Sequence, residues 1–191
     1  MFLRLLAFAL ITTGVFADIV NISPSSLDFG NQFVGSQSTQ SVVLSNPTKK
    51  PLNIASITAT GSFFVPGNPC GSTIAPGTQC VFSVVFSPVA AGAQTGLLSV
   101  NDDANDTPQK VKLSGTGVAV VLTSIAVAPA APAVPLGFAQ QFTATGTYNN
   151  GNIQNLTYTA GWTSTAPSIA AVTRQGRQAR WLKALPQSSH P

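Results

Sequence analysis

The stretch I-A-P-G-T-Q-C-V-F-S-V-V-F-S-P, residues 74–88, carries the pattern from which the fold can be predicted. Its apolar residues Phe82, Val84 and Phe86 recur with a period of two, and Ser83 lies between them. Successive side chains of a β-strand point to opposite faces, so this spacing predicts a strand with one buried face. The Pro-Gly pair before it favours a tight turn. We therefore predict a turn followed by a half-buried strand.

The same alternation continues along residues 18–118, where Gly, Pro and Asn interrupt it about every 8 to 12 residues, as is typical of a β-sandwich. No amphipathic helical pattern stands out. In Q-K-V-K-L-S-G, Val111 and Leu113 alternate with Lys110 and Lys112, which predicts an edge strand with its lysines in solvent. About 100 residues suffice for one sandwich with its own core. The other residues predicted to face inward are Leu27, Phe29, Val42, Leu44, Leu97 or Leu98, and Val100.

The N-terminal seventeen residues, M-F-L-R-L-L-A-F-A-L-I-T-T-G-V-F-A, have the three parts of a secretory signal peptide. Arg4 supplies the basic start, a short apolar run follows, and Val15 and Ala17 are small residues at the cleavage positions. The run is too short to span a bilayer. We predict a signal peptide over residues 1–17, cleaved between Ala17 and Asp18, and no membrane span in the mature chain.

Charge is scarce and unevenly distributed. Charged residues make up 7% of the chain, glutamate is absent, and the formal net charge is +4. Residues 18–173 hold four lysines against five aspartates, a balance of −1, whereas four cations lie in the last stretch. Those four are Arg174, Arg177, Arg180 and Lys183. The positive net charge of the whole chain therefore does not indicate a nucleic-acid-binding surface, and we expect no nucleic-acid partner.

Five motifs in order resemble one family. They are S-L-D-F-G-N-Q-F-V-G (residues 26–35), the predicted strand that ends in Asn46, the stretch 74–88 quoted above, Gly92, and L-S-G-T-G (residues 113–117). Together they resemble the ASH-type domain, named for abnormal spindle protein and hydin, in the bacterial version called choice-of-anchor D. The resemblance implies a seven-stranded immunoglobulin-like β-sandwich related to the major sperm protein fold. Such domains occur in eukaryotic ciliary and centrosomal proteins and, in secreted bacterial chains, as tandem modules.

Cys70 and Cys80, the only cysteines, bound the stretch C-G-S-T-I-A-P-G-T-Q-C. A zinc site takes about four ligands, and the only histidine is His190. A thioredoxin-like pair is spaced C-x-x-C at a helix start, which this pair is not. In an exported chain, the Pro-Gly turn makes a disulfide plausible, and closing such a loop contributes roughly 2.5 to 3 kcal/mol. Bacterial relatives of the resembled family carry cysteines at both places, which supports a structural disulfide.

A second domain is predicted over residues 122–173. L-T-S-I-A-V-A-P, V-P-L-G-F-A-Q-Q-F-T-A-T-G-T-Y-N-N-G and W-T-S-T-A-P-S-I-A-A-V resemble the bacterial Ig-like group 2 domain of intimin-type adhesins and other secreted chains. Phe142, Ala144 and Tyr148 alternate on a predicted inner face. The Asn-Gly pair at 150 and 151 favours a hairpin. We expect Trp162 and Tyr148 to pack in the core rather than stack on a sugar.

The alternation stops at residues 174–191, where no strand or turn pattern is present. We favour a shift of reading frame after Thr173 as the origin of this basic tail, with a functional basic tail as the alternative. In either case the resembled domain lacks its last strands, which leaves an exposed edge prone to pairing. We expect the tail to be disordered and the second sandwich to be incomplete.

No arrangement of residues indicates catalysis. A Ser-His-Asp or Cys-His site needs an imidazole, and His190 belongs to the tail. Asp102, Asp103 and Asp106 in N-D-D-A-N-D are the best candidates for a calcium site, yet the Gly and Glu of an EF-hand loop are missing. A solvated hairpin turn explains them more simply. We predict no enzyme activity, no cofactor and no metal.

Three classes of function remain. The first is a non-catalytic exported protein, a binding, adhesion or spacer module of the cell envelope or exterior whose partner is a protein or a surface glycan. The second is an accessory fragment of a larger secreted enzyme. The third is an intracellular scaffold like the ciliary and centrosomal proteins, which the signal peptide opposes. The predicted location is the periplasm, the cell surface or the exterior.

Overall fold

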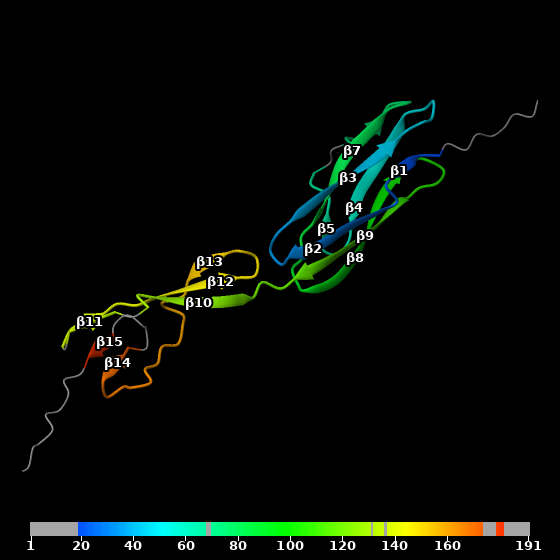
Figure 1. The fold of residues 1–191 in the computed structure, drawn as a ribbon. Helices are drawn as coiled ribbons and strands as arrows, with labels where there is room; N and C mark the ends of the chain where they lie inside the picture. The colour runs from blue at the N-terminus through cyan, green and yellow to red at the C-terminus, as the bar shows by residue number, and fades with distance from the viewer. Residues whose placement is uncertain (1–18, 68–69, 131, 136, 174–178, 182–191) are drawn as a thin grey trace, which may run out of the picture. The chain divides into compact units, whose positions relative to one another are not determined.

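The fold is all-β. A computed structural model describes residues 19–67, 70–130, 132–135, 137–173 and 179–181, and none of these forms a helix. The chain divides into two compact units, residues 1–118 and 119–191 (Figure 1). The predicted signal peptide with its cleavage site at Ala17 and Asp18, and the tail residues Arg174, Arg177, Lys183 and His190, lie outside the described residues.

Unit 1 is a two-layer sandwich of nine strands among its described residues. One sheet has the order β1-β3-β7-β5 and the other β2-β9-β8-β4-β6 (Figure 1). The resemblance implies seven strands; the count is higher because β5 and β6 are pairings of two residues each. The strands are β1 (Asn21–Ser23), β2 (Ser26–Phe33), β3 (Ser38–Ser45), β4 (Leu52–Ala59), β5 (Phe63–Phe64), β6 (Thr73–Ile74), β7 (Gln79–Phe86), β8 (Gly92–Asp102) and β9 (Gln109–Val118).

The core of unit 1 lies between the two sheets and is built from the alternation seen in the sequence. Phe82, Val84 and Phe86 of β7 are buried, as predicted. The Phe86 ring lies 5.7 Å from Phe29 and 4.7 Å from Phe63, measured between ring centroids. Aromatic contacts of this kind dominate small cores. The predicted inward residues Leu27, Phe29, Val42, Leu44, Leu98, Val100, Val111 and Leu113 are all buried.

A close approach explains the glycines of L-S-G-T-G. A Cβ atom on Gly115 would lie 2.6 Å from Cε1 of Phe86, and one on Gly117 would collide with the Ala90 carbonyl oxygen. Glycine is needed wherever a neighbouring group approaches the backbone so closely. The motif therefore keeps room for the Phe86 ring between the sheets.

The predicted position of Q-K-V-K-L-S-G at a sheet edge is wrong. Its strand β9 lies inside the five-stranded sheet, parallel to β2 on one side and antiparallel to β8 on the other. Lys110 and Lys112 are exposed, as predicted, because they point away from the opposite sheet. A strand with one solvated face alternates in the same way at an edge or in the middle, so the alternation could not distinguish the two positions.

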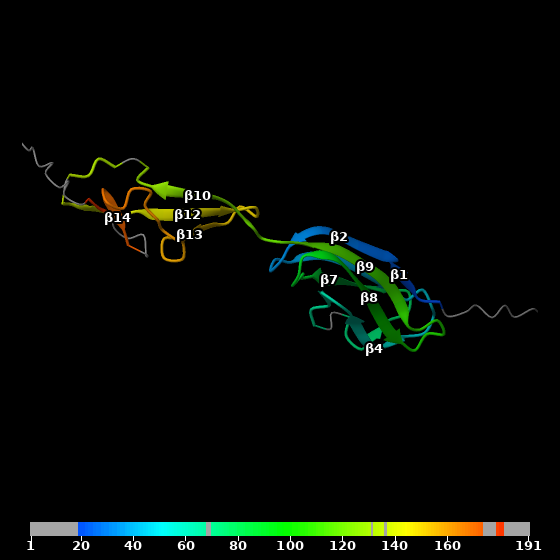
Figure 2. The same cartoon turned by 90° about the horizontal axis from the view of Figure 1, so that it is seen from below.

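Unit 2 forms two small sheets among its described residues. Their orders are β10-β12-β13 and β11-β15-β14 (Figure 2). The predicted Asn-Gly hairpin joins β12 to β13, with Gly151 at φ +81° and its N–H donating to the Tyr148 carbonyl. The strands are β10 (Leu122–Ala128), β11 (Ala139–Gln140), β12 (Thr143–Tyr148), β13 (Ile153–Asn155), β14 (Ala170–Val172) and β15 (Ala179–Trp181).

Burial in unit 2 is slight, as expected of an incomplete sandwich. Ala144 is the only hydrophobic residue of its described part that counts as buried. Phe142 and Trp162 are half-buried and pack on each other with ring centroids 6.3 Å apart. The predicted fold class, all-β with an immunoglobulin-like β-sandwich, is confirmed, and the incomplete second sandwich stays a prediction.

Candidate functional site

A disulfide joins Cys70 and Cys80, whose Cα atoms lie 5.6 Å apart. Cys80 belongs to β7, while Cys70 precedes β6 of the opposite sheet, so the bond ties the two layers together near one end of the sandwich. Between them Gly77 has φ +68°, and the Thr78 N–H donates to the Ala75 carbonyl, which closes the predicted Pro-Gly turn. A bonded pair offers no thiolate ligand for zinc.

Three loops meet at that end of unit 1, and we call loops 46–51, 75–78 and 103–108 the loop end. The register brings them together, because Ser45 pairs with Gln79, Ile54 with Asp102 and Val100 with Gln109. Loops clustered at one end of a sandwich are where immunoglobulin-like folds often bind partners.

Asn46 holds two of these loops in place. Its side chain is fully buried, and its Nδ2 donates to the carbonyls of Lys50 at 2.8 Å and Ile74 at 3.1 Å. Its Oδ1 accepts from the Thr48 hydroxyl at 2.7 Å, and the Gly77 N–H donates to its carbonyl. A buried amide saturated in this way fixes the loop shapes. The sequence placed Asn46 at a strand end but carried no sign of its burial.

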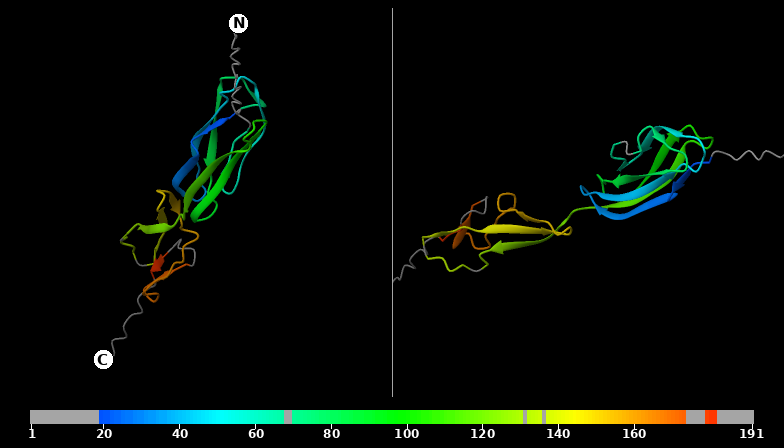
Figure 3. Two further views of the ribbon diagram at one scale, coloured as in Figure 1. Left: turned by 90° about the vertical axis from the view of Figure 1, so that its right-hand side faces the viewer. Right: turned by 90° about the horizontal axis from the view of Figure 1, so that it is seen from above.

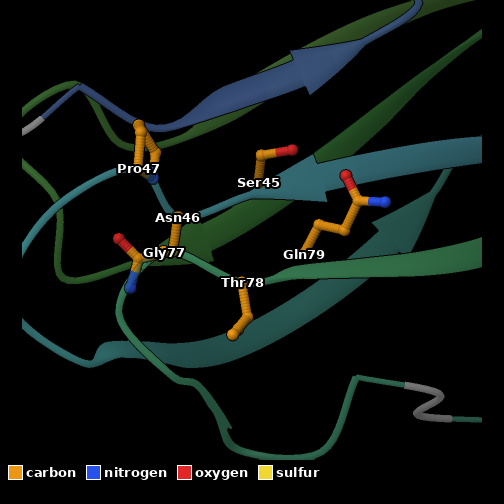
Figure 4. Close-up of a pocket in the computed structure, with 6 residues that line it drawn as sticks. All are labelled: Ser45, Asn46, Pro47, Gly77, Thr78 and Gln79. Atoms are coloured by element: carbon orange, nitrogen blue, oxygen red, sulfur yellow. The ribbon is translucent and has the colours of Figure 1, made fainter.

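A shallow hollow of about 540 Å³ opens beside Asn46. Figure 4 shows Ser45 and Gln79 turned to one side of the ribbon, whereas the Asn46 side chain turns to the other. The hollow is lined by Ser45, Asn46, Pro47, Gly77, Thr78 and Gln79. Since none of these side chains titrates, the hollow can offer and accept hydrogen bonds but cannot supply a general acid or base.

The hollow continues onto a sheet face that carries no charge. The strands β1, β3, β5 and β7 contain no charged residue, while the five-stranded sheet contains four: Asp28, Asp102, Lys110 and Lys112. Ser45 and Gln79 begin the face, followed by the pairs Val43–Val81 and Ser41–Ser83. We call it the neutral face; its outward side chains are those of Asn21, Ser23, Thr39, Ser41, Val43, Ser45, Phe64, Gln79, Val81, Ser83 and Val85.

The aspartates of N-D-D-A-N-D are not brought together as a metal site. Asp102 accepts from the Ala104 N–H, Asp103 accepts from the Asn53 side chain at 2.6 Å, and Asp106 accepts from Gln109. Among the described residues no three His, Cys, Asp or Glu side chains are grouped so that they could hold a metal ion. The loop joins the antiparallel strands β8 and β9, so the hairpin interpretation accounts for these carboxylates.

Hydrogen bonds also set the titration of Asp103. The Asn53 side-chain amide and, less strongly, the Asn53 backbone N–H hold the pKa of this carboxyl below its usual value. Donors favour the charged form of a carboxylate, which lowers its pKa. A carboxylate kept charged at neutral pH suits a structural role, since a general acid needs the opposite shift.

Trp162 and Tyr148 of unit 2 both have partners within that unit. Trp162 Nε1 donates to the Thr157 carbonyl at 3.0 Å, and the Tyr148 hydroxyl lies 3.3 Å from Gln154 Oε1. Trp162 and Tyr148 are both half-buried. The expectation of core packing holds in the sense that Trp162 packs on Phe142.

Comparisons of sequence match parts of this chain. Residues 20–101 match the family described as Transmembrane protein 131-like N-terminal. A 57-residue stretch is 49% identical to "Ice-binding protein 1" of Shewanella frigidimarina, covering 30% of this chain and 6% of that protein. The chain therefore corresponds to a small part of the length of this relative. No segment that the structure describes forms a helix of the length and hydropathy that a membrane crossing requires.

Solved structures with low sequence identity align with part of this chain. A protein of unknown function from Porphyromonas gingivalis W83 has 16% identity and a TM-score of 0.45, covering 51% of this chain and 46% of that one. The ASH/PapD-like domain 7 of human CEP192 has 14% identity and a TM-score of 0.43, covering 62% and 99%. A major sperm protein family member of C. elegans has 8% identity and a TM-score of 0.33, covering 52% and 97%.

Proposed function

We propose that this chain is an exported, non-catalytic immunoglobulin-like module that binds an uncharged partner, a surface glycan in the first place, through the neutral face and the hollow at the loop end. The observation that carries the proposal is the segregation of charge in unit 1. Every charged strand residue lies in one sheet and none in the other. Depletion of charge marks the centre of interfaces, because a buried unpaired charge costs several kcal/mol.

The chemistry of the face fits a neutral polar partner. Hydroxyl and amide groups of Ser41, Ser45 and Gln79 can exchange hydrogen bonds with sugar hydroxyls, and Val43 and Val81 supply apolar contact between them. Val81 is 55% exposed and pairs with Val43 of β3, so its side chain is held outward by the sheet. The disulfide and the predicted signal peptide support an exported setting.

Affinity electrophoresis of the purified chain in gels containing neutral polysaccharides tests this proposal. We expect retarded migration that persists from roughly 0.05 to 0.5 M salt, because such salt screens only charge-based binding. Val81→Lys should abolish the retardation, while Lys112→Ser on the opposite sheet should leave it unchanged. Retardation by anionic polysaccharides alone, lost at high salt, would contradict a neutral partner. If the partner is a protein, no polysaccharide should retard the chain. The wild-type chain should then bind a protein of the cell envelope, and Val81→Lys should not.

A second candidate is a spacer within a larger surface protein. It is favoured by the relative of which this chain matches 6% of the length. The name of that relative adds ice to the uncharged partners to be tested, and ice-recrystallisation assays with the wild-type chain and Val81→Lys measure it. A spacer would bind neither a polysaccharide nor ice, and Val81→Lys and Lys112→Ser would then behave like the wild type.

A further inference from the structure

The edge strands of unit 1 are short or carry a charge, and β5 covers only Val85 and Phe86 of β7. Three of its four edge strands, β1, β5 and β6, are only three or two residues long. The fourth, β2, carries Asp28, and its register shifts between Asp28 and Asn31. Short strands, charges and bulges are the devices by which natural sheets block their edges.

The edge strand β10 of unit 2 has few of these devices. It runs for seven residues, L-T-S-I-A-V-A, without charge or proline. Its only irregularity lies between Leu122 and Ser124; from Ser124 to Ala128 it pairs continuously with β12. On its other side it pairs with no described strand, and Figure 2 and Figure 3 show it at the margin of its sheet. Its outer backbone groups are therefore available for another strand.

An apolar stripe follows the same strand. Leu122, Ile125 and Val127 are 42%, 52% and 43% exposed. Ile125 lies opposite Gly146 and Val127 opposite Ala144, so the neighbouring strand has no side chain large enough to cover either. A second uncharged β-strand could pair with the backbone groups of β10 and at the same time contact its aliphatic stripe.

We propose that β10 pairs antiparallel with β10 of a second copy of this chain. Residues 119–173, which include β10, contain no charged residue, and the four cations of unit 2 lie in residues 174–183. A two-fold axis perpendicular to the sheet would join the two three-stranded sheets into one of six strands. It would also place the aliphatic stripes of both copies side by side on one face. This inference rests on unit 2 and is independent of the proposed function of unit 1.

The expected dimer is weak and reversible. A seven-residue strand is about 23 Å long, so the edge and its stripe bury a few hundred Å² per copy. That is below the ~800 Å² per partner of a standard stable interface. The dimer should therefore form as concentration rises and dissociate on dilution.

Sedimentation velocity of the full chain from roughly 1 to 500 µM, a range that brackets a weak interface, tests the proposal. We expect the weight-average sedimentation coefficient to rise towards that of a dimer. Val127→Lys should keep the chain monomeric throughout, because the lysine places a charge at the seam. Val81→Lys is the control: it adds the same charge at another exposed valine, in unit 1 and away from β10, and it should still dimerise.

A second variant guards against loss of folding in Val127→Lys. Ala126→Cys keeps the stripe intact and, with a short bismaleimide linker, should give a covalent dimer in high yield, while Val81→Cys should not. A wild-type chain that is monomeric at every concentration would overturn the proposal. So would equal loss of dimer in both lysine variants, or equal crosslinking of both cysteine variants, because the interface would then not lie at β10.

Discussion

Both units have strands in which apolar residues alternate with others, but unit 1 buries these apolar residues and unit 2 leaves most of them exposed. In unit 1 two sheets close on a core that contains Phe29, Phe63 and Phe86, and a disulfide crosses between the layers. In unit 2 the aliphatic residues of β10 stay exposed, and Ala144 is the only buried hydrophobic residue in the part described. Alternation thus predicts a strand, but a second layer is needed to turn one face of it into a core.

The largest effect should come from removing a core ring. Phe86→Ala leaves a cavity beneath Gly115 and should lower the free energy of unfolding of unit 1 by roughly 3 to 5 kcal/mol. Phe142→Ala removes a half-buried ring of unit 2 and should cost only roughly 1 kcal/mol. Both tryptophans, Trp162 and Trp181, belong to unit 2, so their fluorescence follows that unit while circular dichroism follows both.

Denaturant titrations with these two signals make the measurement. Equal losses in the two variants would contradict the contrast, because they would mean that unit 2 has a core as well packed as that of unit 1. Loss of the tryptophan transition in Phe86→Ala would show that the units unfold together.

The next effect concerns the disulfide. Replacing Cys70 and Cys80 by serine should lower the stability of unit 1 by roughly 2.5 to 3 kcal/mol, the loss of loop entropy expected for a separation of 10 residues. A reductant should do the same to the wild-type chain, while the tryptophan signal of unit 2, which has no cysteine, should not move. An unchanged midpoint after complete reduction, verified by thiol titration, would mean that the bond constrains little.

The sequence was a good guide where the signal is local. The period of Phe82, Val84 and Phe86, the Pro-Gly turn and the Asn-Gly hairpin each lie within a few residues, and the structure has all of them. The position of β9 was predicted wrongly because strand order depends on partners far away, such as β2 with its parallel pairing. Local alternation carries no information about that partner.

The candidate site was harder to predict for the same reason. Low charge was evident from composition, but its segregation into one sheet depends on which strands pair. Asn46 is buried only because loops 46–51 and 75–78 fold around its amide, and a polar residue at the end of a strand is more often exposed. The aspartates show the converse: they are close in the sequence, yet among the described residues they are not grouped so that they could hold a metal ion.

Asn46 provides a smaller test of the contrast. Asn46→Ala leaves the buried carbonyls of Lys50 and Ile74 without this donor and should cost unit 1 roughly 2 kcal/mol. In unit 2 Asn155 caps the Thr157 N–H from an exposed position, so Asn155→Ala should cost less than about 0.5 kcal/mol. Chemical denaturation of both variants measures the difference, and a larger loss for Asn155→Ala would contradict our account of the loop end.

The smallest effect is expected from acid, and it should separate the units by their titratable groups. Asn53 donates to Asp103 and lowers its pKa, so the contribution of this carboxylate is fully present above its ordinary value near 3.8 and is lost as the pH falls through the lower folded value. Asp103→Asn should therefore be slightly less stable than the wild type at pH 6, and the gap should close near pH 2. Asn53→Ala should narrow the gap at pH 6, because it removes the side-chain donor to Asp103 and leaves the backbone N–H of residue 53. The corresponding hairpin of unit 2 uses Asn150, which accepts from the Asn152 N–H and does not titrate, so its tryptophan transition should be the same for wild type and Asp103→Asn. A gap that persists unchanged at pH 2 would mean that Asp103 stabilises its hairpin by a contact that does not depend on its charge.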